Sequence, residues 1–180
     1  RFEASVAGGI PIIKVITESL AGDKINSIFG IINGTTNYIL TKMIREYWSF
    51  DEALKKAQEL GFAEADPTLD INGSDATHKL AVLATIAFNA AVDKRNIYTE
   101  GIENINLKDV IYAKDLGYVV KLLAIAKRTS DHGMSLSVRP TLLPEQCNLA
   151  NVTNEYNAIM LTSDFLGDSL HVGKGAGSHP

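Results

Sequence analysis

The sequence predicts an α+β domain in which a mixed or mostly antiparallel sheet packs on helices. Apolar residues recur at helical spacing through the first two thirds of the chain, whereas residues 134–173 carry alternating or β-branched runs broken by turns. A block of helices followed by a block of strands is typical of this class, and a regular alternation of the two is not seen. These patterns leave the order of the strands open.

The composition fits one globular domain. Of the 180 residues, 46% are hydrophobic and 21% are charged, a balance that excludes a disordered chain. The net charge of −4 offers no basic surface to nucleic acid or anionic lipid, and no apolar run approaches the roughly 18 residues of a membrane span, so we expect neither partner. The single cysteine, Cys147, cannot form an internal disulfide, which favours a cytoplasmic location.

The first expected elements are a strand and a helix. Residues 24–34, KINSIFGIING, contain a β-branched apolar run closed by Asn-Gly, which predicts a buried strand. Residues 35–47 then carry apolar side chains at helical spacing, with Thr35 as the expected N-cap.

Two further helices are predicted around an acidic segment. Residues 49–61 begin with the Ser-x-x-Glu of a capping box and end in glycine, the usual left-handed stop. A second helix is predicted over residues 74–92, beginning at Asn72 or Ser74. It is nearly all apolar after Lys79, so we expect it in the middle of the domain.

The end of the chain predicts helices and then strands. Residues 106–128 indicate one short and one longer helix, with a hinge near Gly117. Residues 134–143 alternate weakly, and residues 157–173 predict two strands around a Leu-Gly-Asp turn. Residues 144–152 form the connector between them.

The acidic segment, GFAEADPTLDINGSDATHK, ends in a lysine. Its carboxylates are Glu64, Asp66, Asp70 and Asp75, and the lysine is Lys79. A solvated loop explains most isolated acidic runs, and a surface pair of Asp75 and Lys79 would contribute only about 0.3–0.5 kcal/mol. The lysine also borders the apolar part of its helix, where burial lowers the pKa of an amine and a carboxylate raises it. Such an amine is able to donate or accept a proton, and the spacing alone leaves both interpretations open.

Other motifs indicate no further chemistry. The glycine-rich GKGAG of residues 173–177 lacks the order of a phosphate-binding loop. Cys147 has no evident activating neighbour and is interpreted as structural. The histidines lack the spacing of a zinc site, and they are His78, His132, His171 and His179.

The acidic segment resembles the signature segment of homoserine dehydrogenases. It contains Glu-x-Asp-Pro, then an Asp, a Gly-x-Asp, and a lysine four residues beyond that Asp. FEASVAGGIPII, residues 2–13, is similar to the start of the family's substrate domain, and GIINGTTNYIL, residues 30–40, to its next strand and helix. GKGAG resembles its late glycine turn. The resemblance covers essentially all 180 residues in the expected order.

The resemblance implies an oxidoreductase that interconverts L-homoserine and L-aspartate 4-semialdehyde with NAD or NADP, in threonine and methionine biosynthesis. It implies that Lys79 donates the proton in the reductive direction, while carboxylates hold the ammonium group of the substrate. Asp66 is expected only to shape a turn. By this resemblance Glu64 and Asp75 hold the substrate, and Asp70 either binds it or supports Lys79. The family's cofactor-binding positions correspond to Gly61, Glu64 and Gly177.

The resemblance also implies a monovalent cation, usually sodium, bound by residues 3–10. Glu3 would supply a carboxylate, and all-oxygen ligation suits a hard cation. A glycine-rich turn before a strand explains the same segment without a metal. The expected main-chain ligands are Val6, Gly8 and Ile10.

The family's nucleotide-binding fingerprint, a strand, a glycine loop and a helix, does not occur in residues 1–180. We therefore expect a fragment: the substrate-binding and dimerisation domain, inactive alone, with one face of its sheet covered by a second subunit in a homodimer. The alternative is a non-catalytic amino-acid-binding or oligomerisation module. The presence of Glu64, Asp75 and Lys79 together counts against it. Fusion to an aspartate kinase, and the choice between NAD and NADP, stay open.

Overall fold

The computed structural model describes residues 6–131 and 133–175. Its strands are β1 Ile25–Ile31, β2 Tyr98–Thr99, β3 Tyr118–Arg128, β4 Met134–Pro144, β5 Tyr156–Ser163 and β6 Gly167–Lys174. Its helices are α1 Ile12–Lys14, η2 Val15–Ser19, α2 Gly34–Glu46, α3 Phe50–Glu59, α4 Thr68–Ile71, α5 Ser74–Phe88, η3 Lys94–Asn96, α6 Leu107–Asp115 and η4 Asn148–Asn151.

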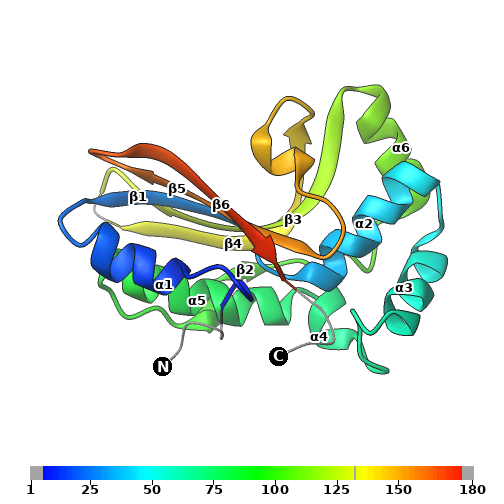
Figure 1. Cartoon of the computed structure of the whole chain (residues 1–180), viewed down its shortest axis with the longest axis horizontal. Helices are drawn as coiled ribbons and strands as arrows, with labels where there is room; N and C mark the ends of the chain where they lie inside the picture. Colours follow the sequence, from blue (N-terminus) through cyan, green and yellow to red (C-terminus); the bar gives the residue numbers. More distant parts are fainter. Residues whose placement is uncertain (1–5, 132, 176–180) are drawn as a thin grey trace.

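The six strands form one sheet in the order β2-β4-β3-β1-β5-β6. All neighbours pair antiparallel except β2 and β4, which are parallel. Helices α1 and α5 lie on one face of the sheet, and α2, α3 and α6 gather at one end (Figure 1). The predicted α+β class, with a mostly antiparallel sheet packed on helices, is confirmed.

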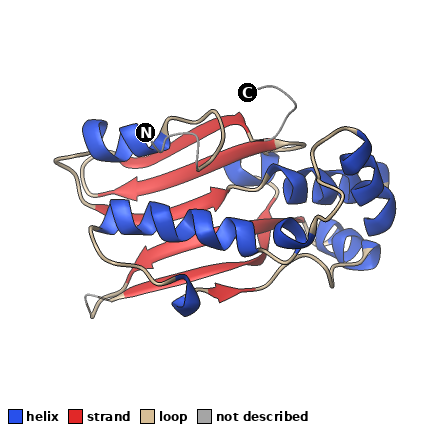
Figure 2. Ribbon diagram, turned by 90° about the horizontal axis from the view of Figure 1, so that it is seen from below, coloured by secondary structure: helices blue, strands red, loops and turns tan. Residues whose placement is uncertain are grey.

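The main core lies between the sheet and α5. This helix packs on β1, β3 and β4, and it crosses the middle of the sheet (Figure 2). Ile28 and Ile159 point from the sheet into this core, as do Leu80 and Leu83 from α5, and all four side chains are fully buried. The prediction of an apolar helix in the middle of the domain is therefore confirmed. None of the helices in the described residues is both long and apolar enough to span a membrane.

The opposite side of the sheet, here called the outer face, carries a smaller cluster. Alternation along β1 turns Phe29 and Ile31 to this face. Ile31 is buried beneath Leu149 and Val152, which belong to or follow η4. Phe29 is only half-buried, so the outer face is covered at one end and open elsewhere.

The cap of α2 differs from its prediction. Asn33, in extended conformation, is the N-cap, and its side-chain oxygen accepts a hydrogen bond from the Thr36 amide at 2.9 Å. Thr35 lies inside the helix. The Asn-Gly pair was interpreted as the end of the strand, although Asn is itself among the best N-caps.

The helix α3 confirms its predicted ends. Ser49 and Glu52 form the reciprocal capping box, and Gly61 follows the helix with a φ of +74°. Between this helix and α5, the structure adds the short helix α4, which the acidic segment did not predict. Gly73 in left-handed conformation then precedes α5.

Two helix predictions are wrong, one in the type of element and one in its length. Residues 118–128 form β3 and not a second long helix, because the segment pairs with β4 on one side and β1 on the other. A continuous apolar run of this kind fits a buried strand as well as a buried helix. The helix α5 also ends at Phe88, where Asn89 adopts a left-handed conformation and stops it before residue 92.

Candidate active site

The candidate site lies where β1 ends and where α2 and α5 begin. The chain leaves β1 through Ile32 and enters α2 at Asn33, while α4 and the first turns of α5 supply acidic and basic side chains. Asp75 lies in the first turn of α5, where the helix dipole favours a carboxylate. Segments far apart in sequence therefore meet at one end of the sheet.

Lys79 is held between a carboxylate and a main-chain oxygen. Its Nζ donates to Asp75 Oδ2 at 2.6 Å and to the Ile32 carbonyl at 3.2 Å. The side chains of Lys79 and Asp75 are 26% and 30% exposed, so the pair is not a fully solvated surface bridge. An ammonium group has three N–H donors, and two of them are used here. The third is available to a substrate oxygen.

Asn33 joins the two acidic side chains. It is 5% exposed, and its Nδ2 donates to Asp70 Oδ1 at 2.7 Å and to Asp75 Oδ2 at 2.9 Å. Since its Oδ1 caps α2, one amide fixes the start of a helix and both carboxylates. The sequence analysis missed this residue. Its only signal was an asparagine at the junction of a predicted strand and a predicted helix.

The environment of Asp70 disfavours its charge. Burial is the largest effect and raises the pKa of Asp70 above its usual value, and the nearby charge of Asp75 adds to this. Hydrogen bonds from Asn33 and Thr35 and the charge of Lys79 act in the opposite direction. A second positive group, such as a substrate ammonium, would relieve the crowding of the two carboxylates.

The loop that carries Gly61 and Glu64 is fastened to the start of α2. Thr35 Oγ1 donates to the Phe62 carbonyl at 2.5 Å, and the Phe62 ring packs on Tyr38 with centroids 5.1 Å apart. Glu64 itself is exposed, and its carboxylate makes no hydrogen bond or salt bridge within the described residues. It is thus free to bind a ligand, but the structure does not join it to Lys79.

Two of the remaining acidic-segment residues behave as expected of structural positions. Asp66 Oδ1 accepts from the Thr68 amide at 3.1 Å and from its hydroxyl at 2.6 Å, which shapes the turn into α4. His78 is exposed, and its ring lies 2.8 Å from Lys94 Nζ. Neither takes part in the hydrogen bonds around Lys79.

The segment predicted to hold a cation forms a tight turn. Ala7 and Gly8 have φ values of +61° and +59°, and a Cβ on Gly8 would lie 2.5 Å from the Lys174 carbonyl. Val6 and Ile10 are buried, and the Ile10 carbonyl accepts from the Ile12 amide at 2.8 Å. The glycine is therefore required by the backbone, whether or not a cation binds.

Two predicted ligands lie outside the described residues, namely Glu3 for the cation and Gly177 for the cofactor. Within residues 6–131 and 133–175, no three His, Cys, Asp or Glu side chains are grouped so as to hold a metal ion.

Comparisons with known proteins identify the family of the chain. The family model described as homoserine dehydrogenase matches residues 11–180. The homoserine dehydrogenase of Bacillus subtilis is 49% identical over 179 residues, which are 99% of this chain and 41% of that protein. The crystal structure of a homoserine dehydrogenase from Thiobacillus denitrificans has 50% identity and a TM-score of 0.94, and the match covers 98% of this chain and 41% of the other.

A more distant structure extends the similarity. A hyperthermophilic archaeal homoserine dehydrogenase in complex with NADPH is 30% identical, with a TM-score of 0.79, over 98% of this chain and 50% of its own. The chain thus spans less than half the length of the curated relatives it matches. The matched segment, in this order and at this identity, assigns the chain to the homoserine dehydrogenase family.

Proposed function

We propose that this chain is the substrate-binding and proton-transfer part of an NAD(P)-dependent oxidoreductase that interconverts L-homoserine and L-aspartate 4-semialdehyde, in threonine and methionine biosynthesis. The observation that carries the proposal is the position of Lys79. Its ammonium is half enclosed, is fixed by Asp75 and the Ile32 carbonyl, and keeps one donor free. A group positioned in this way meets the geometric requirement for a general acid.

In the reductive direction, Lys79 gives a proton to the aldehyde oxygen, and in the oxidative direction it takes one from the alcohol. Asp75 holds the amine in place through their 2.6 Å hydrogen bond. Glu64 and Asp75 hold L-homoserine, and Asp70 either binds the substrate or supports Lys79. When bound, the nicotinamide cofactor supplies the reducing equivalent to the carbonyl carbon.

The cofactor would meet this chain at Gly61 and Glu64, and at Gly177 beyond the described residues. Gly61 is exposed, and a Cβ there would have no atom within 4 Å, so the loop leaves room for a ligand. The NADPH in the archaeal relative supports this class of cofactor. Relatives carry more than half of their length outside the matched segment, and we propose that turnover requires that remainder.

A monovalent cation, sodium by preference, belongs to the same proposal, with Glu3, Val6, Gly8 and Ile10 as ligands. It rests on the resemblance of residues 2–13 to the family's substrate domain, and all-oxygen ligation suits a hard cation. Dependence of activity or thermal stability on sodium over a large organic cation would test it.

A homodimer through the outer face is also proposed. Pairing across four strands aligns Ile125, Phe29, Met160 and Leu170 in one row, and Leu170 is 36% exposed. An apolar row of this kind is favourable to cover. A cytoplasmic location is proposed as well, because Cys147 is a free thiol.

Measurements on the intact protein distinguish the proposed enzyme from a module that binds the amino acid without turnover. We expect NADPH- or NADH-dependent reduction of aspartate 4-semialdehyde, and oxidation of L-homoserine with the oxidised cofactor. Calorimetric titration of L-homoserine provides the second measurement. Binding with no turnover in either direction would favour the non-catalytic module, and neither binding nor turnover would refute both.

A further inference from the structure

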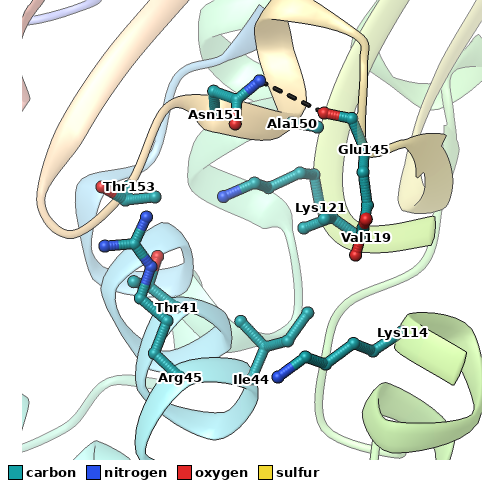
Figure 3. A pocket seen from close by; sticks show the side chains of 10 residues that line it. All are labelled: Thr41, Ile44, Arg45, Lys114, Val119, Lys121, Glu145, Ala150, Asn151 and Thr153. Carbon is teal, nitrogen blue, oxygen red and sulfur yellow. Dashed lines mark hydrogen bonds between the residues drawn. The ribbon is translucent and has the colours of Figure 1, made fainter. Parts of the chain in front are cut away.

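A pocket lies apart from the candidate active site. It has a volume of about 360 Å³ and is formed by α2, α6, the start of β3, and the segment around η4 (Figure 3). None of Asn33, Asp70, Asp75 and Lys79 lines it. Its charged lining consists of Arg45, Lys114, Lys121 and Glu145, so cations exceed anions there although the whole chain has a net charge of −4.

Lys121 is the unusual member of this set. It is 1% exposed, and its Nζ donates to Asn37 Oδ1 at 2.8 Å and to the Val152 carbonyl at 2.6 Å. Both acceptors are uncharged, and within the described residues Lys121 forms no salt bridge. A buried ammonium without a counter-charge costs several kcal/mol. Burial, followed by the charge of Arg45, accordingly lowers the pKa of Lys121 to about 7.

The number of donors distinguishes the two protonation states of Lys121. A neutral amine has two N–H groups, and Asn37 and Val152 accept both. The ammonium form has a third N–H that needs a further acceptor. An acceptor in the pocket would therefore bind best when Lys121 is protonated, because the third N–H then has a partner.

Arg45 is a second cation that is available to the same acceptor. Arg45 is exposed and makes no salt bridge in the part of the chain that the structure describes. Lys114 donates to the hydroxyl of Tyr47 at 2.9 Å, a neutral partner. The amino group of Lys121 and the guanidinium of Arg45 both extend toward Thr153 on one side of the pocket (Figure 3). Two cationic donors thus converge on one space.

We propose that this pocket binds a small oxyanion group, a tetrahedral sulfate or phosphate or a planar carboxylate, between Lys121 and Arg45. Hydrogen bonds between charged partners are about twice as strong as neutral ones, and a guanidinium matches two oxygens of such a group at once. The site is separate from the proposed catalytic one, so its failure would leave that proposal intact.

Titration calorimetry of the purified protein with sodium sulfate tests the proposal. Sulfate keeps the same charge between pH 6 and pH 8, so any pH dependence belongs to the protein. Sodium chloride at equal ionic strength is the reference. We expect one site per chain, with about tenfold tighter binding at pH 6 than at pH 8, because Lys121 must be protonated and its pKa is about 7. Acetate in a parallel titration separates planar from tetrahedral preference.

Variants locate the site. Arg45→Gln should weaken sulfate binding about tenfold, and Lys121→Met should remove both the binding and its pH dependence. Lys108→Met, on the same helix as Lys114 but exposed and outside the pocket, is the matched control and should bind as the parent does. If Lys121→Met does not fold, Arg45→Gln decides. No saturable binding of either anion, equal binding by Arg45→Gln and Lys108→Met, or pH-independent binding would each overturn the proposal.

Discussion

The hydrogen bonds of Lys79 distinguish it from a lysine in a solvated ion pair. Asp75 and the Ile32 carbonyl fix its amine, while Glu64, also proposed to hold the substrate, makes no hydrogen bond or salt bridge with it in the described part of the chain. We therefore expect Lys79→Ala in the intact protein to lower kcat by about 10²–10⁴-fold with a much smaller change in KM, the range typical of a general acid. Steady-state kinetics in the reductive direction provide the measurement. A kcat within a few-fold of the parent would remove the proton-donor assignment.

Asn33 is predicted to position the site through its amide. Asn33→Asp keeps an equally good helix cap but replaces two donated hydrogen bonds by a third carboxylate beside Asp70 and Asp75. We expect lower thermal stability at neutral pH, because a buried third carboxylate lies beside two others, a kcat/KM reduced at least about tenfold, and an acid limb of the pH–rate profile moved to higher pH. Asn106→Asp, which changes the equivalent cap of α6, is the control and should leave the profile unchanged. Identical profiles for both variants would show that Asn33 only caps a helix.

The ionised carboxylate of Asp70 is predicted to lower the free energy of unfolding at neutral pH. Its pKa is raised in the folded state, so folding favours its protonated form. The stabilisation from that form is present below the unfolded pKa and is lost as pH rises through the folded pKa. At pH 7 to 8 the ionised group is therefore a net cost. Asp70→Asn should raise the midpoint of thermal unfolding at pH 8, and the gain should vanish as pH falls below about 4. A variant less stable than the parent at pH 8 would contradict this.

At the scale of elements, the end of the short helix α4 lies so close to Gly101, in another segment, that no side chain fits there. A Cβ on Gly101 would lie 2.1 Å from the Ile71 carbonyl, and the next residue, Ile102, donates its amide to that carbonyl at 2.7 Å. Gly101→Ala must therefore displace the end of α4, which carries Asp70. We expect a stability loss of about 1–3 kcal/mol and weaker L-homoserine binding, measured by denaturation and calorimetry. Gly22→Ala, where a Cβ meets nothing within 4 Å, should change neither.

Elements with strong local signals were predicted well, and those decided by distant partners were not. The capping box and Gly61 mark the two ends of α3, and both signals lie within that segment of the sequence. The strand β3 has no such signal, because a long apolar run suits either structure and only its neighbours β1 and β4 make it a strand. The site divides in the same way. Asp75 and Lys79 are one helical turn apart and were paired from spacing, whereas Asn33 reaches Asp75 from 42 residues away.

At the scale of the whole molecule, α1 and α5 cover one face of the sheet, whereas the outer face is covered only at one end, around η4. The outer face keeps a row of four apolar side chains across β3, β1, β5 and β6, and Val172 beside it is 52% exposed. One isolated chain would leave this row in water, at a cost of about 25 cal/mol for each Å² of apolar surface. A second copy meeting it face to face would bury both rows together.

The apolar row therefore predicts a homodimer, and a single charged substitution within the row should dissociate it. Met160→Glu in the centre of the outer face should convert the intact protein to a monomer at micromolar concentration, because it would bury an unpaired carboxylate in an apolar interface. Leu116→Glu is the control, since Leu116 is 73% exposed, follows α6 and is not a member of the row. Sedimentation equilibrium distinguishes the two states. A monomeric parent, or a Met160→Glu protein that stays dimeric, would show that the outer face is not the interface between subunits.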